Sequence, residues 1–190
     1  MQTKLDQLKA EIIDNAICPE LASFASQLVM GEGNISADIV FVGEAPGKKE
    51  DELGRPFVGA SGKFLDKMLS SVDMNRDDVY ITNIVKYRPP NNRDPSPDEK
   101  AAFWPYLLRQ LDIINPKVVI TLGRHSGSAF IPDLVISRDH GKPRKYTEFG
   151  RDFVVIPLYH PAAALYNGSM RQVLIDDFSL VPDIIKRLKT

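Results

Sequence analysis

The stretch "IVFVGEAPG", residues 39 to 47, sets the fold of this chain. Its first five residues form an apolar run of strand length, and the small and charged residues after it mark a loop. Three further apolar runs follow along the chain: "VYITNIV" (79–85), "VVITLG" (118–123) and "FVVIPL" (153–158). Because segments of helical period separate these runs, they predict parallel strands joined by helices, which is an α/β fold.

The helical segments carry apolar residues at regular three- and four-residue spacing. A first helix is predicted from Leu5, Leu8 and Ile12 and should end near Cys18-Pro19. Two more are predicted by Phe64, Leu65, Met68, Leu69 and Val72, and by Phe103, Leu107, Leu111 and Ile114. The last helix opens with "SPDE" (96–99), in which Ser96 suits the N-cap and Glu99 a capping box. We therefore expect a three-layer sandwich, with a central, mainly parallel four-stranded sheet flanked by helices.

Composition narrows the class of protein. A chain of 190 residues with 43% hydrophobic residues can bury one substantial core, so we expect a single domain over residues 1–190 and a monomer. The net charge of −1 gives no general support for nucleic-acid binding, which would need a local basic patch. The single cysteine, Cys18, excludes an internal disulfide. No stretch reads as a membrane span or secretory signal, and we expect a cytoplasmic protein.

Most of the loop-forming residues come directly after an apolar run. "GEAPG" follows the first run, "NIVKYRPPNNRD" the second, "GRHSG" the third and "YHPAAA" the fourth. In open α/β sheets, the loops beyond the carboxyl ends of the strands form the ligand crevice. We therefore expect these four loops to share one site.

The loop over residues 43–63 combines glycines, carboxylates and one aromatic ring, and it fits neither of the usual phosphate-binding templates. Its acidic residues would also repel a triphosphate. Gly43 and Ala45 permit close approach of a ligand to the backbone, Glu44 or Asp51 can orient a water molecule, and Phe57 offers a stacking face. The alternative is an ordinary solvated turn.

Polar residues at the strand ends each have a structural and a functional interpretation. His160 is either a satisfied structural group or a catalyst, and Asn83 is either a strand-end cap or a reader of a nucleobase edge. Lys86, Arg88 and Arg93 form a solvated loop or contact phosphates. Each residue alone leaves both interpretations open.

Taken together, four blocks resemble the motifs of the family 4 uracil-DNA glycosylases. They are "GEAPGKKEDELGRPFVGASGKFLD" (43–66), "YITNIVKYRPPNNRDPSPDE" (80–99), "PKVVITLGR" (116–124) and "YHPAAAL" (159–165), in that order along the chain. The resemblance implies an enzyme that flips uracil out of single- or double-stranded DNA and hydrolyses its N-glycosidic bond. Two alternatives stay open: a non-catalytic module that binds uracil or lesions, and a glycosylase retuned to another base.

The resemblance also implies roles for single residues. Phe57 would stack on the flipped uracil, Asn83 would bond its O4/N3 edge, and His160 would donate to O2 as negative charge develops there. Glu44 would position or activate the attacking water, with Asp51 as a candidate to share that task. These roles place two catalytic residues, Glu44 and His160, beside the base pocket.

The segment after His160 would face the DNA. Leu165 or Tyr166 would fill the gap left by the flipped base, and Arg171 would reach a phosphate or a stack neighbour. Lys86, Arg88 and Arg93 would contact further phosphates. Uracil-containing DNA is thus the expected partner.

One feature departs from the resemblance. Family 4 enzymes typically hold an iron–sulfur cluster with four cysteines, whereas here only Cys18 stands at such a position, and Asn15, Tyr87 and Phe103 occupy the others. Amide and phenol groups are poor ligands for iron in such a cluster. We therefore expect no cofactor and no metal, and we expect Tyr87, Phe103 and Trp104 to fill the volume by packing.

Overall fold

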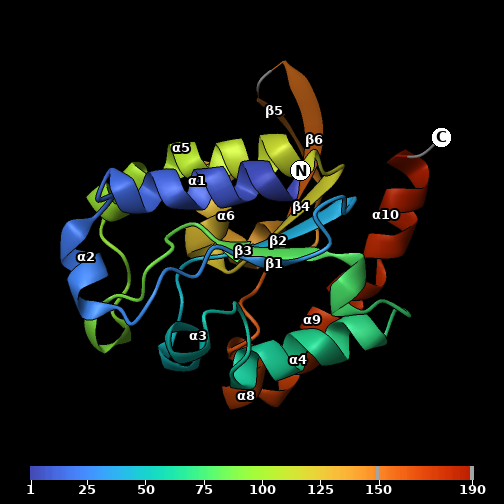
Figure 1. The fold of residues 1–190 in the computed structure, drawn as a ribbon. Coiled ribbons are helices and arrows are strands. Elements are labelled where there is room, and N and C mark those ends of the chain that lie inside the picture. The colour runs from blue at the N-terminus through green and yellow to red at the C-terminus, as the bar shows by residue number, and fades with distance from the viewer. Residues whose placement is uncertain (149, 189–190) are drawn as a thin grey trace.

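The computed structural model describes residues 1–148 and 150–188. Its centre is a six-stranded sheet in the order β1-β3-β2-β4-β6-β5. The strands are β1 (Glu32–Gly33), β2 (Ile39–Gly43), β3 (Tyr80–Asn83), β4 (Val118–Leu122), β5 (Arg144–Glu148) and β6 (Arg151–Leu158). Helices cover both faces of this sheet, so the chain forms a three-layer sandwich (Figure 1).

The four predicted strands are confirmed as the parallel centre of the sheet. β2 pairs in parallel with β3 on one side and β4 on the other, and β4 pairs in parallel with β6. The predicted count of four strands was too small, because β1 and β5 add short antiparallel strands at the two edges. β1 has only two residues and β5 reads "RKYTE", so neither offers the apolar run by which the others were found.

Ten α-helices and two short 3₁₀ turns are described. The helices are α1 (Gln2–Asp14), α2 (Pro19–Phe24), α3 (Lys48–Leu53), α4 (Ala60–Ser70), α5 (Pro97–Ile114), α6 (Arg124–Phe130), α7 (Ile136–Asp139), α8 (Ala163–Tyr166), α9 (Gly168–Ser179) and α10 (Val181–Leu188). The 3₁₀ turns are Arg76–Asp78 and Pro90–Asn92. The three helices predicted from apolar spacing are α1, α4 and α5.

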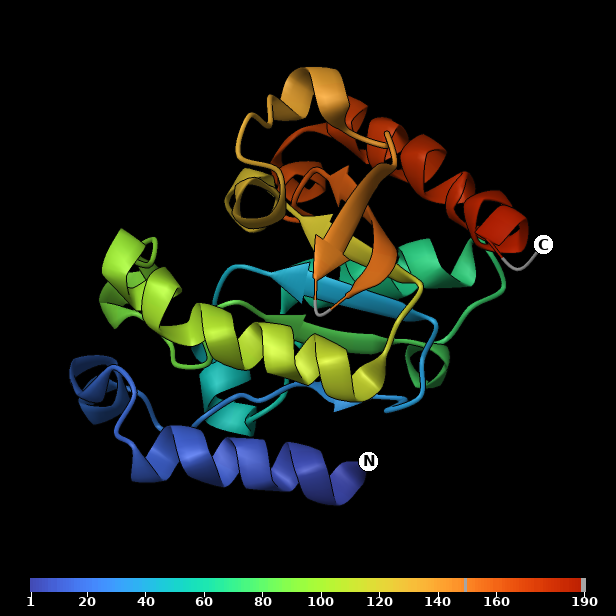
Figure 2. The same cartoon turned by 90° about the horizontal axis from the view of Figure 1, so that it is seen from above.

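Two apolar layers hold the sheet between the helices. Helices α1 and α5 pack on one face, as Figures 1 and 2 show, and Leu5, Leu8 and Ile12 of α1 are buried there. The other face is covered by α4, α9 and α10, with Leu65 and Phe178 fully buried. The predicted start of α5 is confirmed, since the Glu99 N–H donates to Ser96 Oγ and the Ser96 N–H donates to Glu99. None of the described helices is long and apolar enough to cross a membrane.

The parallel register brings the predicted loops to one edge of the sheet. Gly43, the last residue of β2, lies beside Asn83, the last residue of β3. Beyond β4, the Gly123 N–H donates to the carbonyl of Leu158 at the end of β6. The segments that follow these four strand ends therefore surround one crevice, as expected for an open parallel sheet.

Candidate active site

Two adjoining pockets occupy this crevice and share His160 as a wall. The first has a volume of about 170 Å³ and is lined by Ala45, Gly47, Glu50, Phe57, Ser61, Asn83 and His160. The second, of about 250 Å³, is lined by Glu44, Leu122, Gly123, Arg124, His125, Ile136, Tyr159, His160 and Ala163. The structure thus brings together Ala45, Phe57, Asn83 and His160 in the first pocket, and it places Glu44 in the adjoining second pocket.

Phe57 is held in a conformation that bulky residues rarely adopt. Its φ is +51°, in the left-handed region, and its side chain is buried. The Arg76 guanidinium fixes this turn by donating to the carbonyls of Phe57 at 3.0 Å and Pro56 at 2.7 Å. A Cβ on Gly62 would lie 1.7 Å from the Phe57 carbonyl oxygen, so only glycine fits there. The strained turn presents the ring to the first pocket.

Asn83 brings an unused hydrogen-bond acceptor into the pocket. Its Oδ1 and the Thr121 Oγ1 are the buried side-chain atoms without a hydrogen-bond partner in the described part of the chain, and of the two residues Asn83 lines the first pocket. An unpaired buried polar atom costs about 1 to 3 kcal/mol, which a ligand can recover. A Cβ on Gly43 would lie 2.3 Å from this oxygen and 2.7 Å from the Phe57 ring. Gly43 therefore makes room for both side chains.

His160 is poised to donate a hydrogen bond without carrying charge. Its Nδ1 accepts from the Ala162 N–H at 3.1 Å, which leaves the proton of the neutral ring on Nε2. Burial lowers the pKa of His160 to about 4, so the ring is neutral at physiological pH. Its ring centroid lies 5.8 Å from that of Phe57.

Glu44 sits in a network of charged groups in the second pocket. Its Oε1 lies 3.5 Å from Lys100 Nζ and 3.6 Å from His125 Nδ1, and His125 Nε2 lies 3.3 Å from an Asp94 oxygen. Burial raises the pKa of the Glu44 carboxyl, and the positive charges of His125 and Lys100 act in the opposite direction. Glu44, Asp94 and His125 place ligand atoms within 4.8 Å of one another, but the Lys100 ammonium opposes a cation there.

The structure does not bring Asp51 into either pocket. Its side chain is buried on α3 and accepts hydrogen bonds from the Ser26 N–H at 2.8 Å and the Ser26 hydroxyl at 3.0 Å. The pocket residue of this helix is its neighbour Glu50, which sequence reasoning missed. Glu50 Oε1 accepts from the N–H groups of Val58 at 2.9 Å and Gly59 at 2.8 Å. Adjacent residues of a helix point in different directions, so a helix predicted over 48–53 would have placed the side chains of Glu50 and Asp51 on different sides.

The prediction that Lys86 contacts a phosphate was wrong. Its side chain is fully buried, and its Nζ donates to Thr82 Oγ1 at 2.7 Å, to the Asn83 carbonyl at 2.7 Å and to Gln110 Oε1 at 2.6 Å. Burial lowers the pKa of Lys86 to about 7. A lysine held inside the protein in this way cannot reach a DNA backbone.

The other two basic residues of that loop differ from each other. Arg93 is exposed, but its guanidinium is bound by both carboxylate oxygens of Glu99, at 2.6 and 2.8 Å. Arg88 donates to the neutral Asn92 Oδ1 at 2.7 Å and keeps its net charge. Since Asp94 of the same loop reaches His125, the loop lies beside the Glu44 pocket.

The three remaining DNA-facing candidates lie together near α8. Leu165 is 39% exposed and Tyr166 is 91% exposed. The Arg171 guanidinium carbon lies 6.0 Å from the centre of the Phe64 ring. A groove of about 330 Å³ between α4 and α9 is lined by Ala60, Lys63, Phe64, Lys67, Met68, Leu165, Arg171 and Ile175.

Lys63 and Lys67 were not singled out from the sequence. They lie one helical turn apart on α4 and are exposed. Within the described residues, neither has a hydrogen-bond or ion-pair partner. Their spacing of four residues, which puts both lysines on one face of the helix, is the sequence signal that could have identified them. The basic residues of the Pro- and Asn-rich loop were predicted as phosphate contacts instead.

The residues at the four expected cysteine positions do not fit an iron–sulfur cluster. Asn15 is exposed at the end of α1, Phe103 is fully buried, and Tyr87 is nearly so. The Tyr87 and Phe103 rings meet edge to face with centroids 5.9 Å apart, and Cys18 packs against the same core. The Trp104 ring instead packs against the Phe130 ring, with their centroids 4.9 Å apart. Aromatic packing therefore takes the place of a ligand set.

Comparison with known proteins gives the family of this chain. Residues 30–179 match the model of the uracil DNA glycosylase superfamily. A type-4 uracil-DNA glycosylase of Sulfurisphaera tokodaii is 46% identical over 95% of this chain and 84% of its own length. Those of Archaeoglobus fulgidus and Thermotoga maritima are 45% and 42% identical, over 95% and 85% of this chain and 92% and 85% of their own.

The match over most of the chain shows the class: this protein belongs to the uracil DNA glycosylase superfamily. The identities of 42–46% over at least 85% of the chain then show the branch within it. The chain belongs to the type-4 uracil-DNA glycosylases, hydrolases that excise uracil in DNA repair.

Proposed function

We propose that this protein hydrolyses the N-glycosidic bond of uracil flipped out of DNA, using the two adjoining pockets for the two halves of the nucleotide. One observation carries the proposal. Asn83, whose Oδ1 has no hydrogen-bond partner, and neutral His160, whose Nδ1 is occupied by the Ala162 N–H, line the same pocket as the Phe57 ring. Acceptor, donor and stacking surface together match a pyrimidine ring with polar edges.

In this proposal the first pocket binds the base. Uracil stacks on Phe57, while the Asn83 amide bonds the O4/N3 edge by accepting from N3–H and donating to O4. His160 Nε2–H donates to O2. The Ala162 N–H fixes the orientation of this neutral donor. The hydrogen bond from His160 to O2 becomes stronger as negative charge moves onto the base in the transition state.

The second pocket receives the sugar side and the water. Water attacks C1′ of the deoxyribose, the C1′–N1 bond breaks, and its electron pair leaves with the uracil. The Glu44 carboxylate orients the water, offsets the positive charge that develops on the sugar, and accepts the proton that the water loses. The uracil anion takes up a proton from solvent and Glu44 returns its proton to solvent, so the products are free uracil and an abasic site.

The DNA track that we propose runs over α4, α8 and α9. Leu165 or Tyr166 enters the gap left by the base, and Arg171 contacts a phosphate. Lys63 and Lys67 line the same groove and extend this track, whereas Lys86 has no part in it. Arg88 contributes at the opposite rim, and Arg93 contributes less because Glu99 neutralises it.

We also propose that the enzyme works without an iron–sulfur cluster, since the single cysteine cannot supply four thiolates. Its substrate is uracil-containing DNA, single- or double-stranded. Organisation as one domain, a monomeric state and a cytoplasmic location stay predictions from the sequence.

Release of free uracil separates the proposal from its alternatives. The purified protein is incubated with an oligonucleotide carrying one uracil, and both free base and abasic strand are measured. Stoichiometric release in wild type and loss of release in His160→Ala support an enzyme. Tight binding without release points to a non-catalytic module, and release of another base from a panel of damaged oligonucleotides points to a retuned enzyme.

A further inference from the structure

Lys86 is a buried lysine that the proposed mechanism does not use. None of its side chain is exposed, although lysine is among the residues least often fully buried. Its three hydrogen-bond partners are Thr82 Oγ1, the Asn83 carbonyl and Gln110 Oε1, all of them neutral. An ammonium group carries three hydrogens, so the three acceptors satisfy it completely.

The acceptors of Lys86 are themselves fixed by a buried network. Gln110 Nε2 donates to the Met30 carbonyl and to Tyr80 Oη, both at 3.0 Å. Thr82 Oγ1 donates to the same Met30 carbonyl at 2.8 Å. The network therefore links α5, β3 and the segment before β1. Three hydrogen bonds of 2.6 to 2.7 Å join Lys86 Nζ to this network and to the carbonyl at the end of β3.

The end of β3 is where Asn83 reads the base. Asn83 is the last residue of the strand, so its carbonyl lies at the point where the chain leaves the sheet. Lys86 binds this carbonyl from the α5 side of the sheet, while the Asn83 amide faces Phe57 and Gly43 on the other. A shift of the backbone there would move both polar atoms of the amide relative to the base.

We infer that Lys86 is a positioning residue for base selectivity, which holds the Asn83 backbone from behind so that its amide meets uracil and not cytosine. This inference rests on the proposed role of Asn83. It gives a lysine of the "TNIVK" segment a role behind the pocket, where its hydrogen bonds fix the backbone and do not contact DNA. Small displacements of a binding group cost large factors in rate, because the hydrogen bonds must fit the transition state.

The test compares Lys86→Met, of similar size without charge, with wild type. Single-turnover release is measured from oligonucleotides carrying one uracil or one cytosine opposite guanine, over a range of enzyme concentrations. We expect the rate of uracil release to fall about tenfold or more and the preference for uracil over cytosine to shrink by a similar factor. The half-saturating enzyme concentration should change much less.

Two controls separate positioning from general destabilisation. Lys9→Met removes an exposed lysine of α1, and Leu107→Ala destabilises the α5 core without touching the network. Both should keep wild-type selectivity, even where Leu107→Ala lowers the melting temperature. If Lys86→Met keeps the wild-type preference for uracil, or loses rate only as much as Leu107→Ala does, the inference is wrong.

If Lys86→Met does not fold, Thr82→Val removes one of the three acceptors and leaves the charge in place. A smaller loss of selectivity in the same direction is expected, and unchanged selectivity contradicts the inference. Failure of wild type to release uracil at all would instead overturn the proposed function, so the two failures are distinguishable.

Discussion

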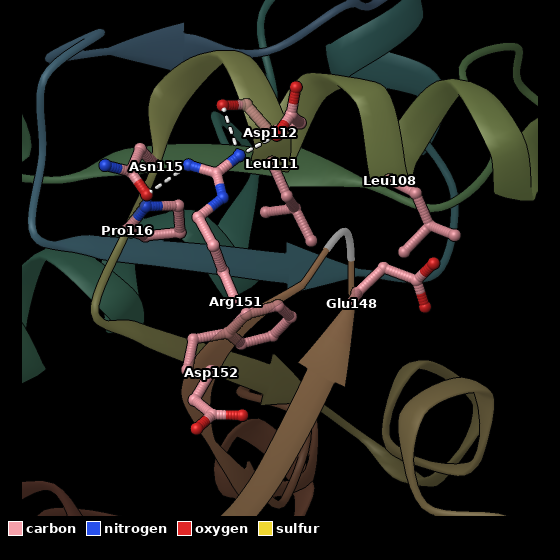
Figure 3. A pocket seen from close by; sticks show the side chains of 9 residues that line it. Leu108, Leu111, Asp112, Asn115, Pro116, Glu148, Arg151 and Asp152 are labelled. Atoms are coloured by element: carbon pink, nitrogen blue, oxygen red, sulfur yellow. Dashed lines mark hydrogen bonds and ion pairs between the residues drawn. The ribbon is translucent and has the colours of Figure 1, made fainter.

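Two hollows of this molecule, at different ends of the sheet, differ in what their polar groups do. The base pocket at the carboxyl ends of the strands holds an unpaired Asn83 oxygen and a free His160 N–H. A hollow beside the β5–β6 hairpin, shown in Figure 3, is also lined by polar residues, yet its Arg151 donates to Asn115 Oδ1 and to the Asp112 carbonyl and pairs with the Asp112 carboxylate.

Size separates the two hollows as well. The hollow of Figure 3 has a volume of about 20 Å³, room for little more than one water molecule, whereas the base pocket has about 170 Å³. In the former, donors and acceptors satisfy each other, so a ligand would have to break existing hydrogen bonds. In the base pocket, the unpaired polar groups can form hydrogen bonds with a ligand. A binding site is thus distinguished from a surface hollow by unsatisfied polar groups more than by its shape.

The largest expected effect lies in the base pocket. His160→Ala should slow uracil release by about 100- to 1000-fold, because it removes a preorganised donor to the developing anion. Glu44→Ala should slow release to a similar extent, because no carboxylate then orients the water or offsets the positive charge on the sugar. Single-turnover rates check both variants.

Arg151→Ala serves as the matched control for these variants. It lies in the hollow of Figure 3, away from the crevice, and should leave uracil release within about twofold of wild type. A loss comparable to that of His160→Ala would show that the two hollows do not differ as described.

The second effect is on stability and not on chemistry. Phe103→Ala should lower the free energy of unfolding by about 3 to 5 kcal/mol, since it removes a fully buried ring that packs on Tyr87. Urea unfolding followed by circular dichroism measures it. Cys18→Ser should be mild and should leave activity intact. Loss of activity in Cys18→Ser, or stoichiometric iron and sulfide in anaerobically prepared protein, would contradict the aromatic packing proposed for this region.

The sequence predicted the parallel centre of the sheet because a buried strand carries a local signature: all five residues of β2 and of β4 are apolar, glycine or threonine, and all are buried. It also predicted the crevice, because strand polarity alone decides at which edge the loops meet. Gly43 was predicted to let a ligand approach the backbone, whereas in the structure its missing side chain makes room for Phe57 and Asn83.

Side-chain partners could not be predicted in the same way. Asp51 and Lys86 are charged residues next to pocket residues, and their charge suggested a functional task. Their burial depends on partners far away in the chain, Ser26 for Asp51 and Gln110 for Lys86. Arg93 is neutralised by Glu99, which was recognised only as part of a helix cap. Such pairings arise from tertiary structure, which local pattern does not encode.

A third effect concerns the salt dependence of DNA binding. Arg171→Ala and Lys67→Ala should each lower the slope of log affinity against log salt by about one unit, because each cation contacts one phosphate. Lys86→Met should leave the slope unchanged, as the side chain is buried. Fluorescence anisotropy of a labelled oligonucleotide at several salt concentrations measures these slopes, and equal slopes in all three variants would remove α4 and α9 from the DNA track.

The smallest effect is a shift in pH dependence. Burial raises the pKa of Glu44, so its carboxylate is lost as the pH falls through a value above the ordinary 4.5, and the rate of release should fall there. His125→Ala removes a positive charge that opposes this shift, which should move the midpoint further upward. Rate profiles between pH 4 and 8 are the measurement. A midpoint that does not move in His125→Ala would show that His125 does not influence the pKa of Glu44.

The most direct test of the base pocket is the selectivity of Asn83→Asp. An aspartate at this position accepts hydrogen bonds but no longer donates to O4, so the pattern that matches uracil is replaced by one that admits the amino group of cytosine. Single-turnover release is measured from oligonucleotides that carry one uracil or one cytosine. We predict rapid release of uracil alone by wild type, and slower release of uracil with measurable release of cytosine by Asn83→Asp. Unchanged discrimination in Asn83→Asp would contradict the assignment of this pocket to uracil.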